Sequence, residues 1–166
     1  MDRIRFFSLL IGALFTCGVL SAAAPDAAVS ADAISLSNGQ TLYVPGYSHI
    51  YSGDQERPVL LAVTVSIRNT DPVRSIVVTA VDYYDSDGKL VKKYIDSPVA
   101  LGPMASIRHV VPESDKAGGS GANFVVRWKS SKPVNPPIVE TIMISTRMQQ
   151  GISFTSRGRV IMEQHD

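Results

Sequence analysis

The chain has 166 residues, with 16 lysines and arginines against 15 aspartates and glutamates. This balance argues against a basic nucleic-acid-binding protein and against an acidic solvating tail. Hydrophobic residues make up 45% of the chain and charged residues 19%, which argues against disorder over most of its length. A chain of this size and composition predicts one compact domain.

Residues 1–23 have the order of a secretory signal peptide. Two arginines near the start precede an apolar stretch over residues 6–20, and small residues follow it. The stretch is shorter than the ~20 apolar residues that span a bilayer, so we expect cleavage after Ala23 rather than a membrane anchor. Cleavage there leaves a chain with no net charge. Such a chain has no electrostatic attraction to nucleic acid or to anionic lipid.

A lipoprotein is the alternative interpretation of the same segment. Leu14-Phe15-Thr16-Cys17 resembles a bacterial lipobox, in which the cysteine is acylated, although Thr16 is larger than the residue usual at that position. We therefore expect a periplasmic or secreted protein, and an envelope protein anchored through Cys17 as the alternative. Cys17 is the single cysteine of the chain, so removal of the signal peptide leaves a protein without disulfides.

Strand patterns begin after a polar lead-in. Residues 24–40 are rich in alanine, serine and aspartate without an apolar stripe, so we expect a flexible lead-in there and a single β domain over residues 41–166. Apolar and polar residues alternate over 61–68, which is the period of a half-buried strand. In residues 75–84, both the odd-numbered and the even-numbered positions include β-branched or aromatic residues, as in a central strand covered on both faces.

The second half of the chain continues as short strands between turns. Residues 90–95 predict a hairpin partner at a sheet edge, because Lys92 and Lys93 discourage strand addition. Further strands are predicted at 106–111, 124–129 and 138–146, with a closing hairpin over 152–162 about Ser156-Arg157-Gly158. Seven or eight short strands without a helical period predict an all-β, antiparallel, immunoglobulin-like β-sandwich, with a small barrel as the alternative. Trp128 is the expected core aromatic.

A resemblance to a known family extends over most of residues 43–161. Its motifs are Tyr47-Ser48-His49-Ile50-Tyr51, Ser66-Ile67-Arg68-Asn69-Thr70-Asp71, Val81-Asp82-Tyr83-Tyr84-Asp85-Ser86-Asp87-Gly88 and Gly118-Gly119-Ser120-Gly121-Ala122-Asn123-Phe124. Together they resemble the bacterial family called domain of unknown function 3124. The resemblance implies an exported bacterial protein and carries over no catalytic or binding residues.

Three aspartates surround one predicted turn. Asp82, Asp85 and Asp87 supply oxygen ligands, and Asp85-Ser86-Asp87-Gly88 is similar to the opening of a calcium loop. The bidentate glutamate of such a loop is missing, because lysines follow the turn. A hairpin turn explains the same residues, since Asp-Gly supplies a positive φ between two strands. The turn is the favoured interpretation, and a calcium site is the alternative.

Two further stretches hold candidate ligand-binding residues. A strand over 47–51 would place Tyr47, His49 and Tyr51 on one face, which suits stacking on a ligand or a sugar. The alternative is a strand face half covered by neighbouring chain. The three histidines are isolated in sequence, so a zinc site is poorly supported.

The glycine-rich stretch comes close to the nucleophile elbow of serine hydrolases. In Gly118-Gly119-Ser120-Gly121-Ala122, however, alanine stands at the last glycine position, and a strand follows where the elbow needs a helix. His109 and Asp115 are the partners that a catalytic triad would use. We favour a flexible or ligand-contacting loop, to which Ser120 and Asn123 contribute.

These patterns favour a non-enzymatic binding or accessory module of the bacterial cell envelope. No cofactor is expected, and the expected partner is an unidentified envelope protein or a glycan. Nucleic acid is excluded by the charge balance, and contact with the membrane is expected only if Cys17 is lipidated. The alternatives are a calcium-dependent or carbohydrate-binding domain and, less favoured, a serine hydrolase that uses Ser120.

The signal segment yields a direct test of export. Protein recovered from the periplasm or the medium is expected to start near Ala24, because signal peptidase cuts after small residues. Intact-mass measurement checks this start. A full-length mass for the recovered protein would contradict export, and a diacylglycerol adduct on Cys17 would replace cleavage at Ala23 with the lipoprotein alternative.

Overall fold

The structure of the protein is a computed structural model that describes residues 35–54, 56–146 and 151–164. The signal segment and Cys17 lie outside the described residues, as does most of the lead-in. The described part contains twelve β-strands and no helix. No described segment is therefore a helix of the length and apolarity that crossing a bilayer requires.

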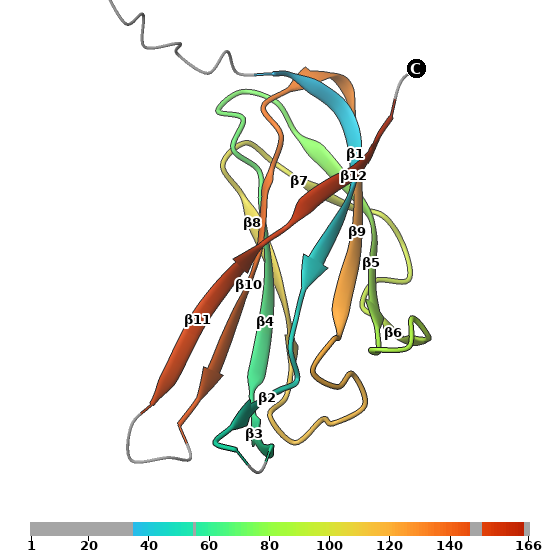
Figure 1. The fold of residues 1–166 in the computed structure, drawn as a ribbon. Coiled ribbons are helices and arrows are strands. Elements are labelled where there is room, and N and C mark those ends of the chain that lie inside the picture. Colours follow the sequence, from blue (N-terminus) through green and yellow to red (C-terminus); the bar gives the residue numbers. More distant parts are fainter. Residues whose placement is uncertain (1–34, 55, 147–150, 165–166) are drawn as a thin grey trace, which may run out of the picture. The chain divides into compact units, whose positions relative to one another are not determined.

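Two antiparallel sheets form the two layers of the fold (Figure 1). The first sheet has the order β12-β1-β9-β5-β6, with β7 also paired to β5. Its strands are β1 (Ser37–Pro45), β5 (Ile76–Tyr84), β6 (Leu90–Lys93), β7 (Val99–Leu101), β9 (Asn123–Val134) and β12 (Arg159–Glu163). The second sheet has the order β11-β10-β4-β8. Its strands are β4 (Ala62–Arg68), β8 (Ser106–Val111), β10 (Ile138–Ser145) and β11 (Ile152–Arg157).

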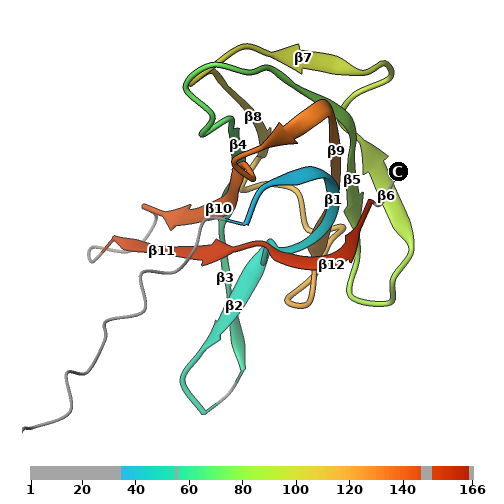
Figure 2. The same cartoon turned by 90° about the horizontal axis from the view of Figure 1, so that it is seen from above.

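A third, two-stranded sheet is formed by β2 (His49–Ser52) and β3 (Arg57–Leu60). Seen from above, this hairpin projects away from both main sheets (Figure 2). The predicted all-β antiparallel sandwich is confirmed, with twelve strands where seven or eight were expected. The sequence did not predict β1, β3 and β7. It suggested β2 only in part, as a strand over residues 47–51 that would place Tyr47, His49 and Tyr51 on one face.

The core lies between the two main sheets and follows the predicted alternation. On β4 and the residue before it, Leu61, Val63, Val65 and Ile67 are fully buried. The facing side of β9 contributes Phe124, Val126 and Trp128, which are also fully buried. Burial of alternate residues on facing strands is what holds two sheets together as a sandwich.

The predicted lead-in is too long at its C-terminal end. Ser37 to Gln40 form the first half of β1, which pairs with both β9 and β12. These residues are small or polar, so their side chains do not show the strand pattern. Their backbone is nevertheless fixed, and Gln40 Nε2 and Ser37 Oγ donate hydrogen bonds to the carboxylate of Glu163 at 2.7 and 2.9 Å.

The predicted closing hairpin over 152–162 is also wrong. β11 pairs with β10 in the second sheet, whereas β12 pairs with β1 in the first. The chain passes from one sheet to the other at Gly158, whose N–H donates to the carbonyl of Val139 at 2.8 Å. A turn residue between two alternating runs predicts a change of direction, but it does not determine which strand each run pairs with.

Asn69 ties the β4–β5 connection to neighbouring loops at one end of the sandwich. Its buried side-chain amide donates to the carbonyls of Arg74 and Gly102, both at 2.8 Å, and to that of Leu101 at 3.2 Å. One side chain thereby satisfies carbonyls from two separate connections. Buried backbone carbonyls of this kind cost free energy when they lack a partner.

Asp71 completes this arrangement two residues further on. Its Oδ1 atom accepts from the N–H groups of Val73 and Arg74 at 2.9 and 2.8 Å, and its Oδ2 atom accepts from Asn135 at 3.3 Å. The N–H groups of Val73 and then Arg74 are the main causes that lower the pKa of Asp71. The stabilisation is therefore present above the ordinary aspartate pKa and is lost as the pH falls through the folded-state value.

Trp128 supplies the test of the core. Replacement by alanine is expected to cost about 3–5 kcal/mol of the free energy of unfolding, because a fully buried indole leaves a large cavity. Trp128→Phe is expected to cost less, because the buried Nε1 atom has no hydrogen-bond partner among the described residues. Urea unfolding followed by circular dichroism measures both changes.

Val73→Ala is the matched control, because the Val73 side chain is 76% exposed and its truncation is expected to change stability by less than about 0.5 kcal/mol. A cost below about 1 kcal/mol for Trp128→Ala would contradict its place in the core.

Candidate functional site

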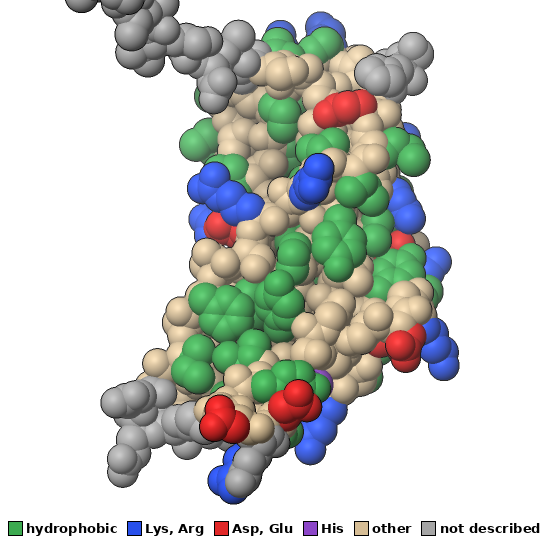
Figure 3. All heavy atoms as spheres, viewed as in Figure 1, with side chains coloured by type: hydrophobic (Ala, Val, Ile, Leu, Met, Phe, Trp, Pro, Cys, Tyr) green, Lys and Arg blue, Asp and Glu red, His purple; other side chains and the backbone are tan. Residues whose placement is uncertain are grey.

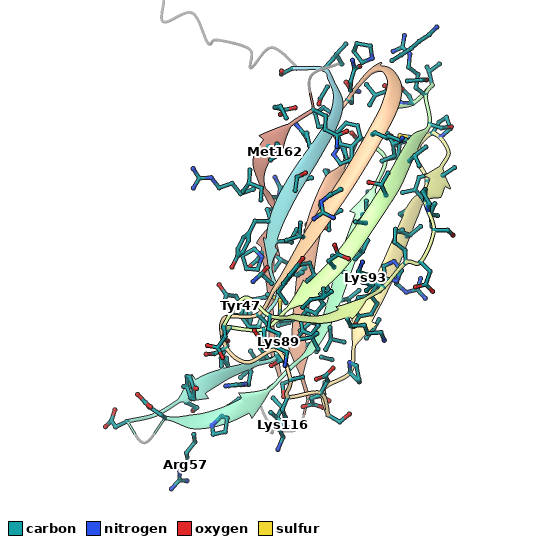
Figure 4. All side chains as sticks on the ribbon, turned by 90° about the vertical axis from the view of Figure 1, so that its right-hand side faces the viewer. Tyr47, Arg57, Lys89, Lys93, Lys116 and Met162 are labelled. Carbon is teal, nitrogen blue, oxygen red and sulfur yellow. The ribbon has the colours of Figure 1, made fainter. Side chains whose placement is uncertain are left out.

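Many of the residues singled out from the sequence lie on the loops at one end of the sandwich, opposite the β4–β5 connection (Figure 1). We call it the loop end and define it as residues 46–61, 85–89 and 112–122. It comprises the β2–β3 hairpin with its lead from β1, the β5–β6 turn and the β8–β9 loop. Figure 4 shows Tyr47, Lys89 and Lys116 at this end. Loops at one end of a sandwich are common positions for binding sites, because the sheets hold them rigidly.

The glycine-rich loop is fastened to the β5–β6 turn through Ser86. The backbone N–H of Ser86 donates to the carbonyl of Gly118 at 2.9 Å, and its hydroxyl donates to the same carbonyl at 3.1 Å. The N–H of Gly121 in turn donates to the Ser86 hydroxyl at 2.9 Å. These bonds cross between two loops that are more than 30 residues apart in sequence, so they fix the loop in place.

A second attachment joins the same loop to the lead of the hairpin. The N–H and the hydroxyl of Ser48 both donate to the carbonyl of Gly119 at 3.1 Å. The carbonyl of Ser48 accepts from the N–H of Leu61 at 2.9 Å, which closes the base of the hairpin. The glycine-rich loop is therefore hydrogen-bonded to two other segments, the β5–β6 turn and the lead of the hairpin.

The glycine at position 118 is required by the aromatic residue beneath it. A Cβ atom built at Gly118 would overlap the hydroxyl of Tyr83 and would lie 2.7 Å from Cβ of Ala122. Tyr83 is fully buried and packs against Phe124 with a ring separation of 4.9 Å. Burial, followed by the negative charge of Asp115, raises the pKa of Tyr83 to about 12, so its hydroxyl stays protonated at neutral pH.

The structure brings two of the three predicted aromatic-face residues together and separates the third. His49 Nε2 lies 3.3 Å from the hydroxyl of Tyr51, and the two rings meet edge to face at 5.2 Å. Tyr51 remains 53% exposed. Tyr47 precedes β2 and packs instead against Phe154 of β11, at a ring separation of 6.2 Å. Because β2 begins at His49, Tyr47 lies outside the strand, and its side chain does not follow the alternating directions of the strand residues.

Ser120 and Asn123 lie in different local environments. Ser120 is half-buried in the turn before β9, whereas Asn123 is the first residue of β9 and pairs with Pro45 and Tyr84 on its two sides. His109 packs on Tyr94 at 5.3 Å, and Asp115 Oδ1 accepts from the N–H of Ala117. No hydrogen bond within the described ranges links Ser120, His109 and Asp115 as a triad requires.

Two of the three aspartates proposed as calcium ligands have separate partners for their carboxylates. Asp82 Oδ2 is paired with the guanidinium of Arg127 at 3.1 Å. Asp85 Oδ1 accepts from the N–H groups of Asp87 and Lys89 at 3.0 and 2.8 Å, and Gly88 has a φ of 78°. No group of three or more histidine, cysteine, aspartate or glutamate side chains in the described part is arranged to hold a metal. Asp85 and Gly88 therefore form the hairpin turn that the Asp-Gly pair predicted.

Sequence reasoning missed a cluster that closes the gap between the edge strands β6 and β8. The Lys92 ammonium lies 4.5 Å from the centre of the Tyr94 ring, and the Tyr94 hydroxyl donates to the carbonyl of Val110 at 3.4 Å. His109 packs on the same ring, and burial followed by the charge of Lys92 lowers its pKa. Lys92 and Lys93 predicted an edge strand in this stretch, but no sequence signal showed that Tyr94 faces β8.

The fold and the loop end define a class of protein: an antiparallel β-sandwich with an exposed aromatic hairpin at one end. The particular family follows from the sequence. Residues 39–161 match the family described as protein of unknown function (DUF3124), and the chain belongs to this family. The resemblance stated from the sequence motifs is thereby confirmed.

No curated protein matches the chain. One similar solved structure is described as "Crystal Structure of Thermotoga maritima 1070". It is 12% identical, with a TM-score of 0.45, and the match covers 75% of this chain and 97% of that one.

Gly118 supplies the test of this loop. Gly118→Ala is expected to lower the free energy of unfolding by roughly 1–3 kcal/mol, because the added methyl group overlaps the Tyr83 hydroxyl and forces the packed loop to move. Gly102→Ala is the matched control, since a Cβ at Gly102 meets nothing within 4 Å. Thermal and urea unfolding measure both variants.

The pair Gly118→Ala and Tyr83→Phe tests the cause of that loss. Because phenylalanine lacks the hydroxyl, the double variant is expected to lose less stability than the sum of the two single variants. Strict additivity would contradict the overlap between position 118 and the Tyr83 hydroxyl.

Proposed function

We propose that the protein is a non-enzymatic binding or accessory module of the bacterial cell envelope, and that it engages its partner through the β2–β3 hairpin. The single observation that carries the proposal is the side chain of Tyr51, which is 53% exposed on a projecting hairpin and held edge to face by His49. Exposed tyrosines with a fixed orientation are frequent anchors of binding surfaces, because little conformational entropy remains to be lost.

The hairpin also presents a second rigid apolar side chain beside the tyrosine. Pro58 lies directly opposite Tyr51 in the β2–β3 register and is exposed. Val59, on the other side of the same strand, is buried against the body of the protein. One face of the hairpin thus fixes its position while the other remains available to a partner.

The non-enzymatic role is supported by the way in which the reactive side chains are used. Asp82 and Asp85 are engaged in an ion pair and in a turn, and Asp115 caps its own loop. In the motif around Ser120, the backbone groups of Gly118, Gly119 and Gly121 form hydrogen bonds that attach the loop to Ser86 and Ser48. The envelope location is supported by the signal-like residues 1–23 and by the implication of the family resemblance.

A glycan is one candidate partner and an envelope protein is the other. The exposed ring of Tyr51 beside the imidazole of His49 favours a sugar, because aromatic faces stack on the apolar faces of sugar rings and neighbouring polar atoms bond to hydroxyls. The carbohydrate-binding function is therefore retained as the second candidate.

Site-specific photocrosslinking tests the binding surface. A photoreactive phenylalanine analogue at position 58, in intact cells of the source bacterium, is expected to give a discrete adduct, whereas the same analogue at the exposed position 73 is expected to give none. Digestion of the adduct with a protease or with a glycan hydrolase identifies its class. Tyr51→Ala is expected to reduce the yield from position 58 at least severalfold.

Tyr43→Ala is the matched control, because Tyr43 is a 39% exposed tyrosine on β1 and outside the hairpin. It is expected to leave the yield unchanged. Equal yields from positions 58 and 73, or a yield that Tyr51→Ala does not change, would contradict binding through the hairpin.

A further inference from the structure

The edge strand β11 lacks the features that protect the other outer edges of the two main sheets. β6 is four exposed residues long and carries Lys92 and Lys93. β8 carries the exposed Arg108, and its edge is partly covered by Tyr94. β12 has an irregular register with β1. Charges, short length, cover and bulges are the usual means of preventing strand addition at an edge.

By contrast, β11 offers six residues to an added strand. Its first five residues, Ile152 to Ser156, include no charge and no proline, and its register with β10 is regular. In the described part of the chain, β11 is paired with β10 alone. Its outer backbone N–H and C=O groups are therefore a template for another extended chain.

Apolar side chains accompany this open edge on the inner face of the strand. Ile152 and Phe154 are half-buried, and Phe154 is in ring contact with Tyr47. Figure 3 shows hydrophobic side chains gathered in the region where Figure 1 places β11 and β2. An added strand at β11 would cover part of this surface as well as satisfy the backbone.

We propose that the added strand is β11 of a second copy of this chain, paired antiparallel about a two-fold axis at Phe154. The sequence of β11 complements itself in this arrangement. Phe154 faces Phe154 of the copy, which is an aromatic cross-strand pair, and Ser153 faces Thr155, which is a pair of hydroxyl residues. Aromatic and hydroxyl pairs are among the cross-strand pairs that stabilise antiparallel sheets.

Charge does not oppose the pairing. Arg157, the one charged residue of β11, faces the neutral Gly151 of the copy, so no like charges meet across the interface. The two half-buried Tyr47–Phe154 ring pairs meet at the axis and cover each other. The second sheets of the two copies then form one continuous sheet of eight strands, with identical contacts on both sides of the axis.

This assembly goes beyond the proposed binding through the hairpin, because Tyr51 and Pro58 are not part of it. The oligomeric state is the first measurement. Sedimentation equilibrium and native mass spectrometry of the purified protein are expected to show a dimer that dissociates on dilution. A monomer at all concentrations up to about 100 µM would overturn the proposal.

Paired charge variants test which strand carries the dimer. Ser153→Lys with Thr155→Lys places lysines opposite each other in the proposed register, and this double variant is expected to be monomeric. Ser153→Glu with Thr155→Glu is expected to be monomeric for the same reason. An equimolar mixture of the two is expected to restore a dimer that contains one copy of each, because opposite charges then face each other.

The matched control places the same charges on the other edge of the same sheet. Ser106→Lys with Val110→Lys changes two exposed residues of β8 and is expected to leave the dimer intact. Circular dichroism and thermal melting verify that every variant is folded. A dimer that survives both β11 charge variants, or a folded mixture that does not re-form the dimer, would overturn the proposal.

Discussion

The inner face of β9 is the constraint on which the rest of the structure depends. Phe124, Val126 and Trp128 are buried against the facing sheet, while the backbone of β9 pairs with β1 on one side and β5 on the other. Because β9 starts directly after the glycine-rich loop, the packing of Phe124 also fixes where that loop lies. The geometry of the loop end is therefore a consequence of core burial, with hydrogen bonds through Ser86 and Ser48 adding the final attachment.

The two ends of the sandwich use polar side chains for different purposes. At one end, the side chains of Asn69 and Asp71 satisfy buried backbone groups of several connections. At the loop end, Ser48 and Ser86 satisfy the backbone of the glycine-rich loop, while the Tyr51 side chain on the hairpin is exposed. Polar groups that are hydrogen-bonded inside the fold stabilise it, whereas the exposed ring of Tyr51 is available for contact with a partner.

The two proposed surfaces are compatible with each other. The hairpin presents Tyr51 and Pro58, whereas the β11 edge is accompanied by Tyr47 and Phe154. Tyr47 lies two residues before β2 and packs on Phe154 of β11, so the lead of the hairpin is part of the same apolar surface. A two-fold pairing at β11 would thus present two hairpins from one assembly, and paired modules bind repeated partners with higher avidity than single ones.

The sequence by itself determined eight of the twelve strands and much of the core. The alternation over residues 61–68 and 124–129 predicted which side chains are buried, and Asp-Gly predicted the turn at Gly88, because both signals are local. Only the tertiary structure decided which strands and side chains are neighbours. It places β11 and β12 in different sheets and packs Tyr47 on Phe154. It also shows that a side chain at position 118 would overlap the Tyr83 hydroxyl. Such contacts join residues far apart in the chain. The alternation of buried and exposed residues along a strand is the same whichever strand pairs with it, so the sequence pattern does not identify the partner.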